Sequence, residues 1–254
     1  MGCQMGIFTY SRSMCALLFA CGLVWFAPTA PANAATLLSP GPAVLIKKSA
    51  EPFGIATTIL GEGGLRDKWR GVRRRLEEEM VLLALCDGDR KGCMSPAALK
   101  LLAIVDGARA RDGRARLGEV NRAINLAVKA TSDLAQYGQT DFWASPLMTF
   151  ASGAGDCEDY AIAKLVALRL SGSPTEDLRI VLLHDTVHGD DHAVAAARLD
   201  GHWLTLDNRR MAMVEDSDVR NYRPTFVIDQ SNVMRYAEPS LLAYAALRLP
   251  AQAD

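Results

Sequence analysis

The sequence has no excess of charge of either sign. Its 28 lysines and arginines are balanced by 29 aspartates and glutamates, which gives a formal net charge of −1. Attraction to nucleic acid or to anionic lipid needs a basic surface, so the charge balance argues against both as partners. The arginines at positions 70 and 73–75 do not alter this. Three glutamates follow them at 77–79 and predict a solvated, salt-bridged helix face.

Long hydrophobic runs are also missing. The most apolar stretch, Met14 to Ala27, is only about fourteen residues long, and a membrane span needs about twenty. Arg12 precedes it, and the small-x-small pattern Ala32–Ala34 follows it. This arrangement predicts a signal peptide over residues 1–34, cleaved before Ala35, and export to the periplasm. An uncleaved anchor is the alternative. A lipoprotein signal is disfavoured because no cysteine stands at the cleavage point.

Cysteine is scarce in the predicted mature chain. Of six cysteines, three fall within the predicted signal peptide, which leaves Cys86, Cys93 and Cys157. An odd number in an oxidising compartment predicts one disulfide. Cys86 and Cys93 enclose a short, glycine-containing loop and are the expected pair. Cys157 remains outside that pair, and its presence in an exported protein asks for a chemical explanation.

Periodicity divides the rest of the chain into helices followed by strands. Apolar residues at helical spacing predict helices over 65–85, from Ser95-Pro96 onward, over 117–134 and over 157–170. Strands are expected at 178–184, 192–199, 202–207 and 226–228, with irregular segments at 35–64, 106–114 and 137–155. Helices followed by a helix on an antiparallel sheet predict an α+β fold. With no internal repeat or linker, residues 35–254 are expected to form one domain.

A two-residue turn allows one position in the sheet to be worked out. Asp200-Gly201 between two strands predicts a tight hairpin that pairs Leu199 with His202. Continuing that register outward places His192 on the same sheet face as Asp207, as a diagonal neighbour about 7–8 Å away between Cα atoms. His202 falls on the opposite face. The hairpin therefore predicts an imidazole beside a carboxylate, the base and the orienting group of a nucleophilic triad.

Cys157 stands where a nucleophile is expected. It follows the glycine-rich turn 153–156 at the start of a predicted helix, whose N-terminus favours a thiolate and offers N–H groups to an oxyanion. The candidate triad is thus Cys157, His192 and Asp207. Each also has a plainer interpretation: an inert buried cysteine, a structural histidine on a strand, and an aspartate in a turn.

The residues around this triad resemble the bacterial transglutaminase-like cysteine proteinases. The resemblance rests on Asp-Phe-Trp-Ala-Ser-Pro at 141–146 and on Gly-Ala-Gly-Asp-Cys-Glu-Asp-Tyr-Ala-Ile-Ala-Lys at 153–164. Asp-His-Ala-Val at 191–194, Leu-Asp-Asn at 206–208 and Tyr-Arg-Pro-Thr-Phe at 222–226 also fit, so it covers about Leu65 to Asp229. Met148 departs from it, because many relatives carry an acidic residue there.

The resemblance implies a papain-like fold and endoproteolysis of a protein substrate, typically a large cell-surface adhesin. It also implies dependence on Ca²⁺ bound by the acids that flank the thiol, here Asp156 and Glu158, and control by an inner-membrane receptor that sequesters the protease. The residues themselves also favour a bound cation. Clustered carboxylates are suitable ligands for Ca²⁺, and without a cation their negative charge would disfavour the thiolate of Cys157. The alternative is that these acids only cap the helix.

Other functions remain open at this point. The same triad could pass an acyl group to an amine, as a transglutaminase does, and a non-enzymatic secreted binding module could keep the fold. A metal site formed by His184, His188, Asp190 and His192 is a weaker possibility, because Gly189 places these residues in a loop rather than on one helix face.

Overall fold

The computed structural model describes residues 49–238, so the predicted signal peptide, its cleavage site and residues 35–48 lie outside the described residues. The helices are α1 (Gly64–Gly88), α2 (Pro96–Arg109), α3 (Gly113–Ala127), α4 (Asp133–Tyr137), α5 (Pro146–Ser152) and α6 (Cys157–Leu170). The strands are β1 (Thr57–Ile59), β2 (Lys129–Ala130), β3 (Ala154–Gly155), β4 (Leu178–Asp185), β5 (Asp190–Leu199), β6 (His202–Leu206), β7 (Val214–Glu215), β8 (Tyr222–Ile228) and β9 (Val233–Tyr236). Within the described residues, no helix is both long and apolar enough to span a membrane.

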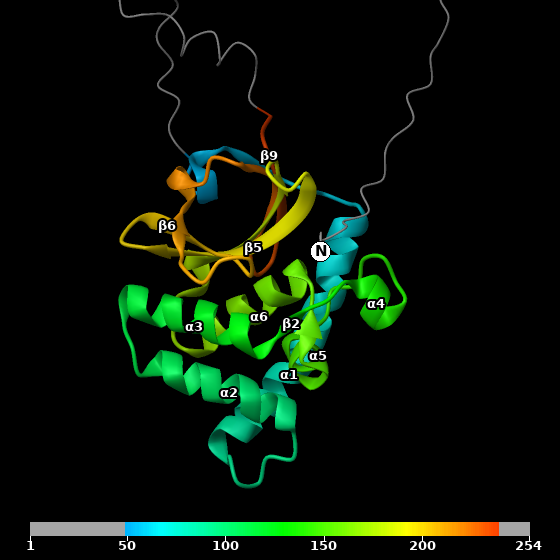
Figure 1. Ribbon diagram of the computed structural model, residues 1–254, viewed down its shortest axis with the longest axis vertical. Coiled ribbons are helices and arrows are strands. Elements are labelled where there is room, and N and C mark those ends of the chain that lie inside the picture. Colours follow the sequence, from blue (N-terminus) through cyan, green and yellow to red (C-terminus); the bar gives the residue numbers. More distant parts are fainter. Residues whose placement is uncertain (1–48, 239–254) are drawn as a thin grey trace, which may run out of the picture. The chain divides into compact units, whose positions relative to one another are not determined.

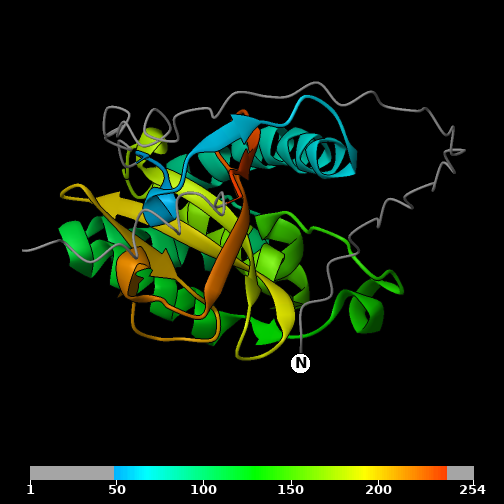
Figure 2. The same ribbon diagram turned by 90° about the horizontal axis from the view of Figure 1, so that it is seen from above.

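Seven of the strands form one antiparallel sheet in the order β1-β9-β8-β4-β5-β6-β7. Helices α2, α3 and α6 lie below this sheet in Figure 1, whereas the upper part of α1 rises beside it, as the view from above also shows (Figure 2). Helix α6 packs against β4 and β5 and also contacts α2, α3 and α5. The main core lies between α6 and the sheet, and alanines at alternate positions of β5, such as Ala193 and Ala195, let the helix approach closely. The predicted α+β class is confirmed.

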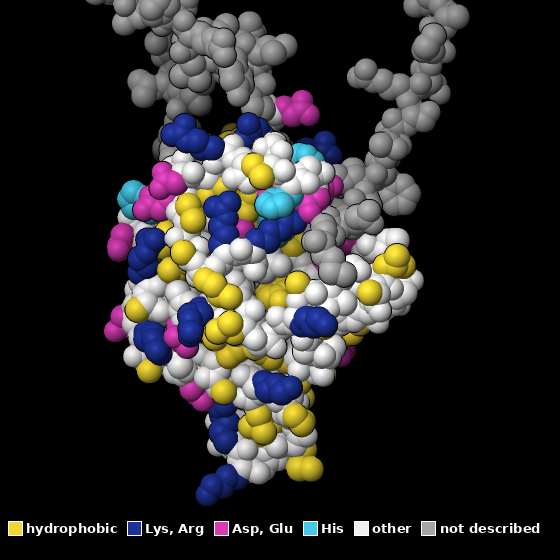
Figure 3. Space-filling view, viewed as in Figure 1, with side chains coloured by type: hydrophobic (Ala, Val, Ile, Leu, Met, Phe, Trp, Pro, Cys, Tyr) yellow, Lys and Arg dark blue, Asp and Glu magenta, His cyan; other side chains and the backbone are white. Residues whose placement is uncertain are grey.

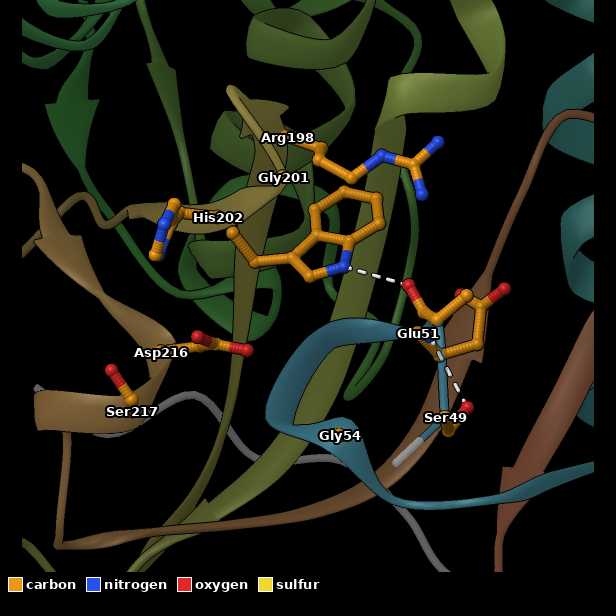
Figure 4. A pocket seen from close by; sticks show the side chains of 10 residues that line it. Ser49, Glu51, Gly54, Arg198, Gly201, His202, Asp216 and Ser217 are labelled. Carbon is orange, nitrogen blue, oxygen red and sulfur yellow. Dashed lines mark hydrogen bonds between the residues drawn. The ribbon is translucent and has the colours of Figure 1, made fainter. Parts of the chain in front are cut away.

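A smaller cluster covers the other face of the sheet. It contains Trp203, Val194 and Leu183, and the chain entering at residues 49–56 packs over it through Phe53 and Ile55. Trp203 Nε1 donates a hydrogen bond to the carbonyl of Ala50, shown by a dashed line in Figure 4. Apolar residues on both faces explain why the central strands read as nearly continuous hydrophobic runs.

The predicted helix at 157–170 matches α6 at both ends, whereas other boundaries differ. Helix α3 ends at Ala127 instead of near residue 134, because β2 turns away to pair in parallel with β3. Helix α2 continues to Arg109 through part of the expected irregular segment. The segment at 137–155 contains α5, which begins after Ser145 with proline in its first turn. Strands β1, β7 and β9, two to four residues long, escaped sequence analysis.

The predicted disulfide is present, with Cys86 and Cys93 bonded and their Cα atoms 4.8 Å apart. The charged face of α1 is not wholly solvated as predicted. The guanidinium of Arg75 donates to the carbonyl of Trp143, and Glu79 accepts hydrogen bonds from the hydroxyl of Ser145 and the backbone N–H of Leu147. Two of these charges therefore hold the segment that leads to α5.

The hairpin between β5 and β6 has the predicted turn and register. Asp200 and Gly201 both have positive φ angles, 52° and 82°, and Leu199 pairs with His202 and Ala195 with Leu206. Two successive left-handed residues are the signature of a turn whose twist matches that of the strands. The register that positions His192 therefore depends on this turn.

Replacing Gly201 with alanine is expected to lower the free energy of unfolding by about 1–2 kcal/mol, because a side chain disfavours this left-handed conformation. Gly71→Ala in α1 is the matched control. It should raise stability by about 0.5–1 kcal/mol, since glycine is a poor helix residue. Urea unfolding of both variants measures the difference. A Gly201→Ala variant as stable as the wild type would show that the turn does not hold the register.

Candidate active site

Two buried side chains meet at the hairpin. His192 on β5 and Asp207 just after β6 are both almost inaccessible to solvent, and His192 Nε2 lies 2.9 Å from Asp207 Oδ1. The sequence-derived register thus brings the predicted imidazole and carboxylate together. With Nε2–H directed at the carboxylate, Nδ1 is the basic nitrogen of the neutral ring. Nδ1 is buried and has no hydrogen-bond partner among the described residues.

Asp207 is surrounded by donors. Its carboxylate accepts hydrogen bonds from the Tyr222 hydroxyl and from the backbone N–H of Arg209, and Arg210 Nε lies 3.9 Å from Oδ2. Burial by itself raises the pKa of Asp207, but the hydrogen bonds and the charge of His192, together with the other donors, bring that pKa well below its usual range. Asp207 is therefore ionised at neutral pH and orients the ring.

Tyr222 and Arg209 were not singled out as site residues from sequence. Tyr222 appeared only within the family-like string at 222–226, on a strand that sequence analysis began four residues later. Asn125 on α3 also escaped notice, although its amide donates to the carbonyl of Asp207 and so fixes the chain just after β6. Only contacts between distant elements identify these residues, and periodicity within one segment carries no signal for them.

Cys157 is the first residue of α6 and is buried in the main core. Its Sγ lies 2.9 Å from Glu158 Oε2. Burial, with a further contribution from the negative charge of Asp141, raises the pKa of Glu158 to about 8. Cys157 therefore lies where the sequence predicts, at the start of a helix directly after a glycine-rich turn.

The other histidines lie elsewhere. His184 contacts Asp191, His188 contacts Asp185, and the exposed His202 contacts Glu215. Figure 4 shows His202 in a separate pocket with Glu51 and Asp216, one that neither His192 nor Asp207 lines. The four residues of the weaker metal-site hypothesis therefore have different partners: Asp190, for example, binds Arg209 and His192 binds Asp207.

A cluster of three carboxylates lies at the start of α6. Oxygen atoms of Asp133, Asp156 and Asp159 lie within 4.8 Å of one another, and each residue has one buried oxygen that accepts no hydrogen bond from the described residues. Asp156 is the N-cap residue of α6, but its side chain makes no capping hydrogen bond. Capping therefore does not account for Asp156. An alanine Cβ at Gly155 would lie 2.8 Å from the Asp159 side chain, so the cluster also requires glycine there.

Burial and mutual repulsion disfavour the ionised forms of these acids. Burial raises the pKa of Asp156 to about 11, and the charges of Glu158, Asp159 and Asp133 add to the shift. Burial likewise raises the pKa of Asp159 to about 7, and the charge of Asp133 contributes in the same direction. All the candidate metal ligands are carboxylate oxygens, and several of them have no hydrogen-bond partner among the described residues. Such oxygens are the ligands that suit Ca²⁺. The residues present therefore fit that ion. Of the two ligands predicted from sequence, Asp156 lies in this cluster and Glu158 lies against Cys157. Asp159 is one of the acids that crowd the thiol in the sequence, whereas Asp133 has no sequence signal.

Residues 80–237 match the family model described as bacterial transglutaminase-like cysteine proteinase. The chain belongs to this family. It is accordingly a cysteine peptidase that acts on protein. Among the curated proteins none matches the chain.

Solved structures of Legionella pneumophila LapG are similar in fold. One is 22% identical, with a TM-score of 0.51, and the match covers 66% of this chain and 94% of LapG. A calcium-bound LapG structure matches with 22% identity and a TM-score of 0.51, covering 64% of this chain and 91% of LapG. An EGTA-treated structure matches with 21% identity and the same TM-score, covering 66% and 94%. Together with the family match, they confirm the transglutaminase-like fold predicted from sequence.

A second polar centre secures the loop before β5 in this cysteine peptidase. The carboxylate of Asp185 is buried and accepts hydrogen bonds from Val187 N, Asn221 Nδ2, His188 Nδ1 and an Arg209 guanidinium nitrogen. Burial raises its pKa, but these donors outweigh burial and hold the pKa well below the usual range. The loop 185–190, the segment after β6 and the start of β8 are thereby tied together. On the face shown in Figure 3, basic, acidic and histidine side chains gather over the sheet.

Asp185→Asn is expected to lower the free energy of unfolding by about 2–3 kcal/mol, because an amide turns one acceptor into a donor facing other donors. The matched control is Asp191→Asn, whose partner His184 is half exposed; its effect should stay within about 0.5 kcal/mol. Chemical denaturation at several pH values measures both.

The sign of the pH dependence follows from the lowered pKa of Asp185. The advantage of aspartate over asparagine should be full above about pH 4 and fall as the pH drops below that value. An advantage that is instead unchanged down to pH 2 would contradict the network.

Proposed function

We propose that this chain is an exported, calcium-dependent endopeptidase with Cys157 as nucleophile, His192 as general base and Asp207 as the orienting acid. The buried His192–Asp207 pair carries the proposal, because it leaves one ring nitrogen, Nδ1, as a base without a partner among the described residues. The family match supplies the thiol chemistry. Helix α6, which begins with Cys157, packs against β5, the strand that bears His192.

In the proposed reaction, Cys157 Sγ attacks the carbonyl carbon of the scissile peptide as His192 Nδ1 takes the thiol proton. The C–N bond then breaks, and His192 gives that proton to the leaving amine. Water, activated by the same nitrogen, hydrolyses the thioester and restores the thiol. Backbone N–H groups in the first turn of α6 are suited to hold the oxyanion, since helix N-termini present donors without intrahelical partners.

The proposed calcium site comprises Asp156 and Glu158, as the motif indicates, together with Asp133 and Asp159, as the geometry indicates. When bound, the ion would supply positive charge beside the thiol. The chain's own part is to bring α4 and the start of α6 together at this cluster. Asp159 Oδ1 also accepts a hydrogen bond from the backbone N–H of Ala144, which ties the segment before α5 to the same place.

For the biological role, we propose cleavage of a large cell-surface adhesin from the periplasmic side, under the control of an inner-membrane receptor that sequesters the enzyme. The family-like strings and the predicted signal peptide support this role. Acyl transfer to an amine is the competing outcome of the same thioester, and the acceptor distinguishes the two reactions.

Cys157→Ala and His192→Ala are expected to abolish peptide cleavage, and Asp207→Asn to reduce kcat less than His192→Ala does, because an orienting group is partly replaceable. His202→Ala, a histidine on the same hairpin but in another pocket, is the control and should retain wild-type turnover. Incubation of a peptide library in H₂¹⁸O, followed by mass spectrometry, records the new carboxyl ends. Isopeptide products instead of ¹⁸O-labelled carboxylates would establish acyl transfer, and cleavage by Cys157→Ala would refute the triad.

Calcium is expected to raise the melting temperature of the wild-type protein, and EGTA to reverse the rise, because a ligand that binds only the folded state stabilises it. Asp133→Asn and Asp156→Asn should lose most of this response, and Glu158→Gln should weaken it. Asp112→Asn, a fully exposed acid at the start of α3, is the control and should respond as the wild type does. Thermal unfolding with and without Ca²⁺ provides the measurement. An undiminished response in Asp133→Asn would exclude the geometric ligand set.

A further inference from the structure

Lys164 is a charged residue in the interior that the proposed reaction does not use. It lies in the middle of α6, and its side chain is fully buried. Its ammonium group makes one hydrogen bond within the described residues, from Nζ to the carbonyl oxygen of Leu206 at 3.2 Å, and stands 5.7 Å from the ring centre of Tyr160. A buried ammonium with three donors and one acceptor is unfavourable for stability. Its presence is therefore better explained by function than by packing.

The position of Lys164 links the two halves of the site. Lys164 follows Cys157 by seven residues, two helical turns, so both residues lie on the same face of α6 about 10 Å apart along its axis. The carbonyl that Lys164 binds belongs to the residue immediately before Asp207. From Asp159 to Leu170, and within residues 49–238, no other side chain of α6 donates a hydrogen bond to the seven-stranded sheet. The remaining contacts of this part of the helix with the sheet are apolar and non-directional.

The electrostatic surroundings point the same way. Burial lowers the pKa of Lys164 to about 7, and the negative charge of Asp207 acts against this shift. Lys164 and Asp207 therefore interact favourably, even though the ammonium contacts the backbone beside the carboxylate and not the carboxylate itself. A methionine in the same place would fill a similar volume without the burial of charge.

We propose that Lys164 is a positioning residue, which fixes the helix that carries Cys157 against the strand end that carries Asp207 and so sets the approach of the thiol to His192. This inference rests on the proposed function. A directional hydrogen bond at this point restricts sliding of α6 along the sheet, which apolar contacts alone resist weakly. Small displacements of reacting groups reduce the rate strongly and leave substrate binding remote from the thiol unchanged.

The test compares Lys164→Met and Lys164→Gln with the wild type in saturating Ca²⁺. Active sites are counted by titration with a thiol-directed irreversible inhibitor, so that kcat refers to competent molecules only. Lys164→Met should lower kcat at least about tenfold with KM within about twofold, while the melting temperature stays equal or rises, since a buried charge has been removed. Lys164→Gln, whose amide can still donate to Leu206, should recover part of kcat. Lys100→Met, an exposed lysine on α2, is the matched control and should behave as the wild type does.

A value of kcat within twofold of the wild type in Lys164→Met would overturn the proposal. So would a Lys164→Gln variant no more active than Lys164→Met, or a loss of stability with kcat per titrated site unchanged. If Lys164→Met does not fold, the kcat of Lys164→Gln and of Lys164→Arg decides. Failure of the proposed function looks different: the wild type itself then cleaves no peptide bond, or Cys157→Ala remains active, whatever residue stands at position 164.

Discussion

The arrangement around the candidate site depends on the burial of one carboxylate. Asp207 is almost inaccessible to solvent, and an ionised carboxylate in that setting is stable only if donors surround it. The donors come from separate parts of the chain: His192 from β5, Tyr222 from β8 and a backbone N–H from the turn after β6. Satisfying this charge therefore fixes three segments of the sheet relative to one another. The imidazole is oriented as a consequence.

The acids of the cluster at the start of α6 follow the opposite rule. Both oxygens of Asp207 accept hydrogen bonds, whereas Asp133, Asp156 and Asp159 each leave an oxygen without a donor among the described residues. The pKa shifts have opposite signs for this reason: donors lower the value for Asp207, while burial and mutual repulsion raise the value for Asp156. Asp133 and Asp159 each accept one backbone hydrogen bond, from Phe142 and Ala144, and the carboxylate oxygens left over are ligands of the kind that suits Ca²⁺.

The parts of the site that the sequence predicts are those set by local interactions. Asp200-Gly201 fixes its own turn, and the turn fixes the register as far as His192, so this part of the site follows from pattern alone. The helix from Cys157 to Leu170 is likewise predictable, because its apolar residues and preceding glycines are contiguous.

The position of Asp133 in the site is not predictable from sequence. Asp133 reaches Asp156 through the parallel pairing of β2 with β3, which involves two residues on each strand. That pairing leaves no periodic signal. The same pairing ends α3 earlier than its apolar pattern predicts. The role of the charges on α1 has no local signal either, because Arg75 and Glu79 contact residues 68 positions away.

Helix α6 brings these local and distant constraints together. Its first turn carries the candidate nucleophile and two acids, Asp159 ties it to the segment before α5, and Lys164 ties it to the end of β6. Apolar burial holds such a helix strongly but sets its position along the sheet only loosely, because hydrophobic contacts have no preferred direction. Polar contacts at two points along one rigid element do have direction. Contacts at both points restrict where the first residue of the helix lies relative to the sheet. Otherwise unfavourable buried polar groups on α6 are therefore best understood as determinants of geometry and not of stability.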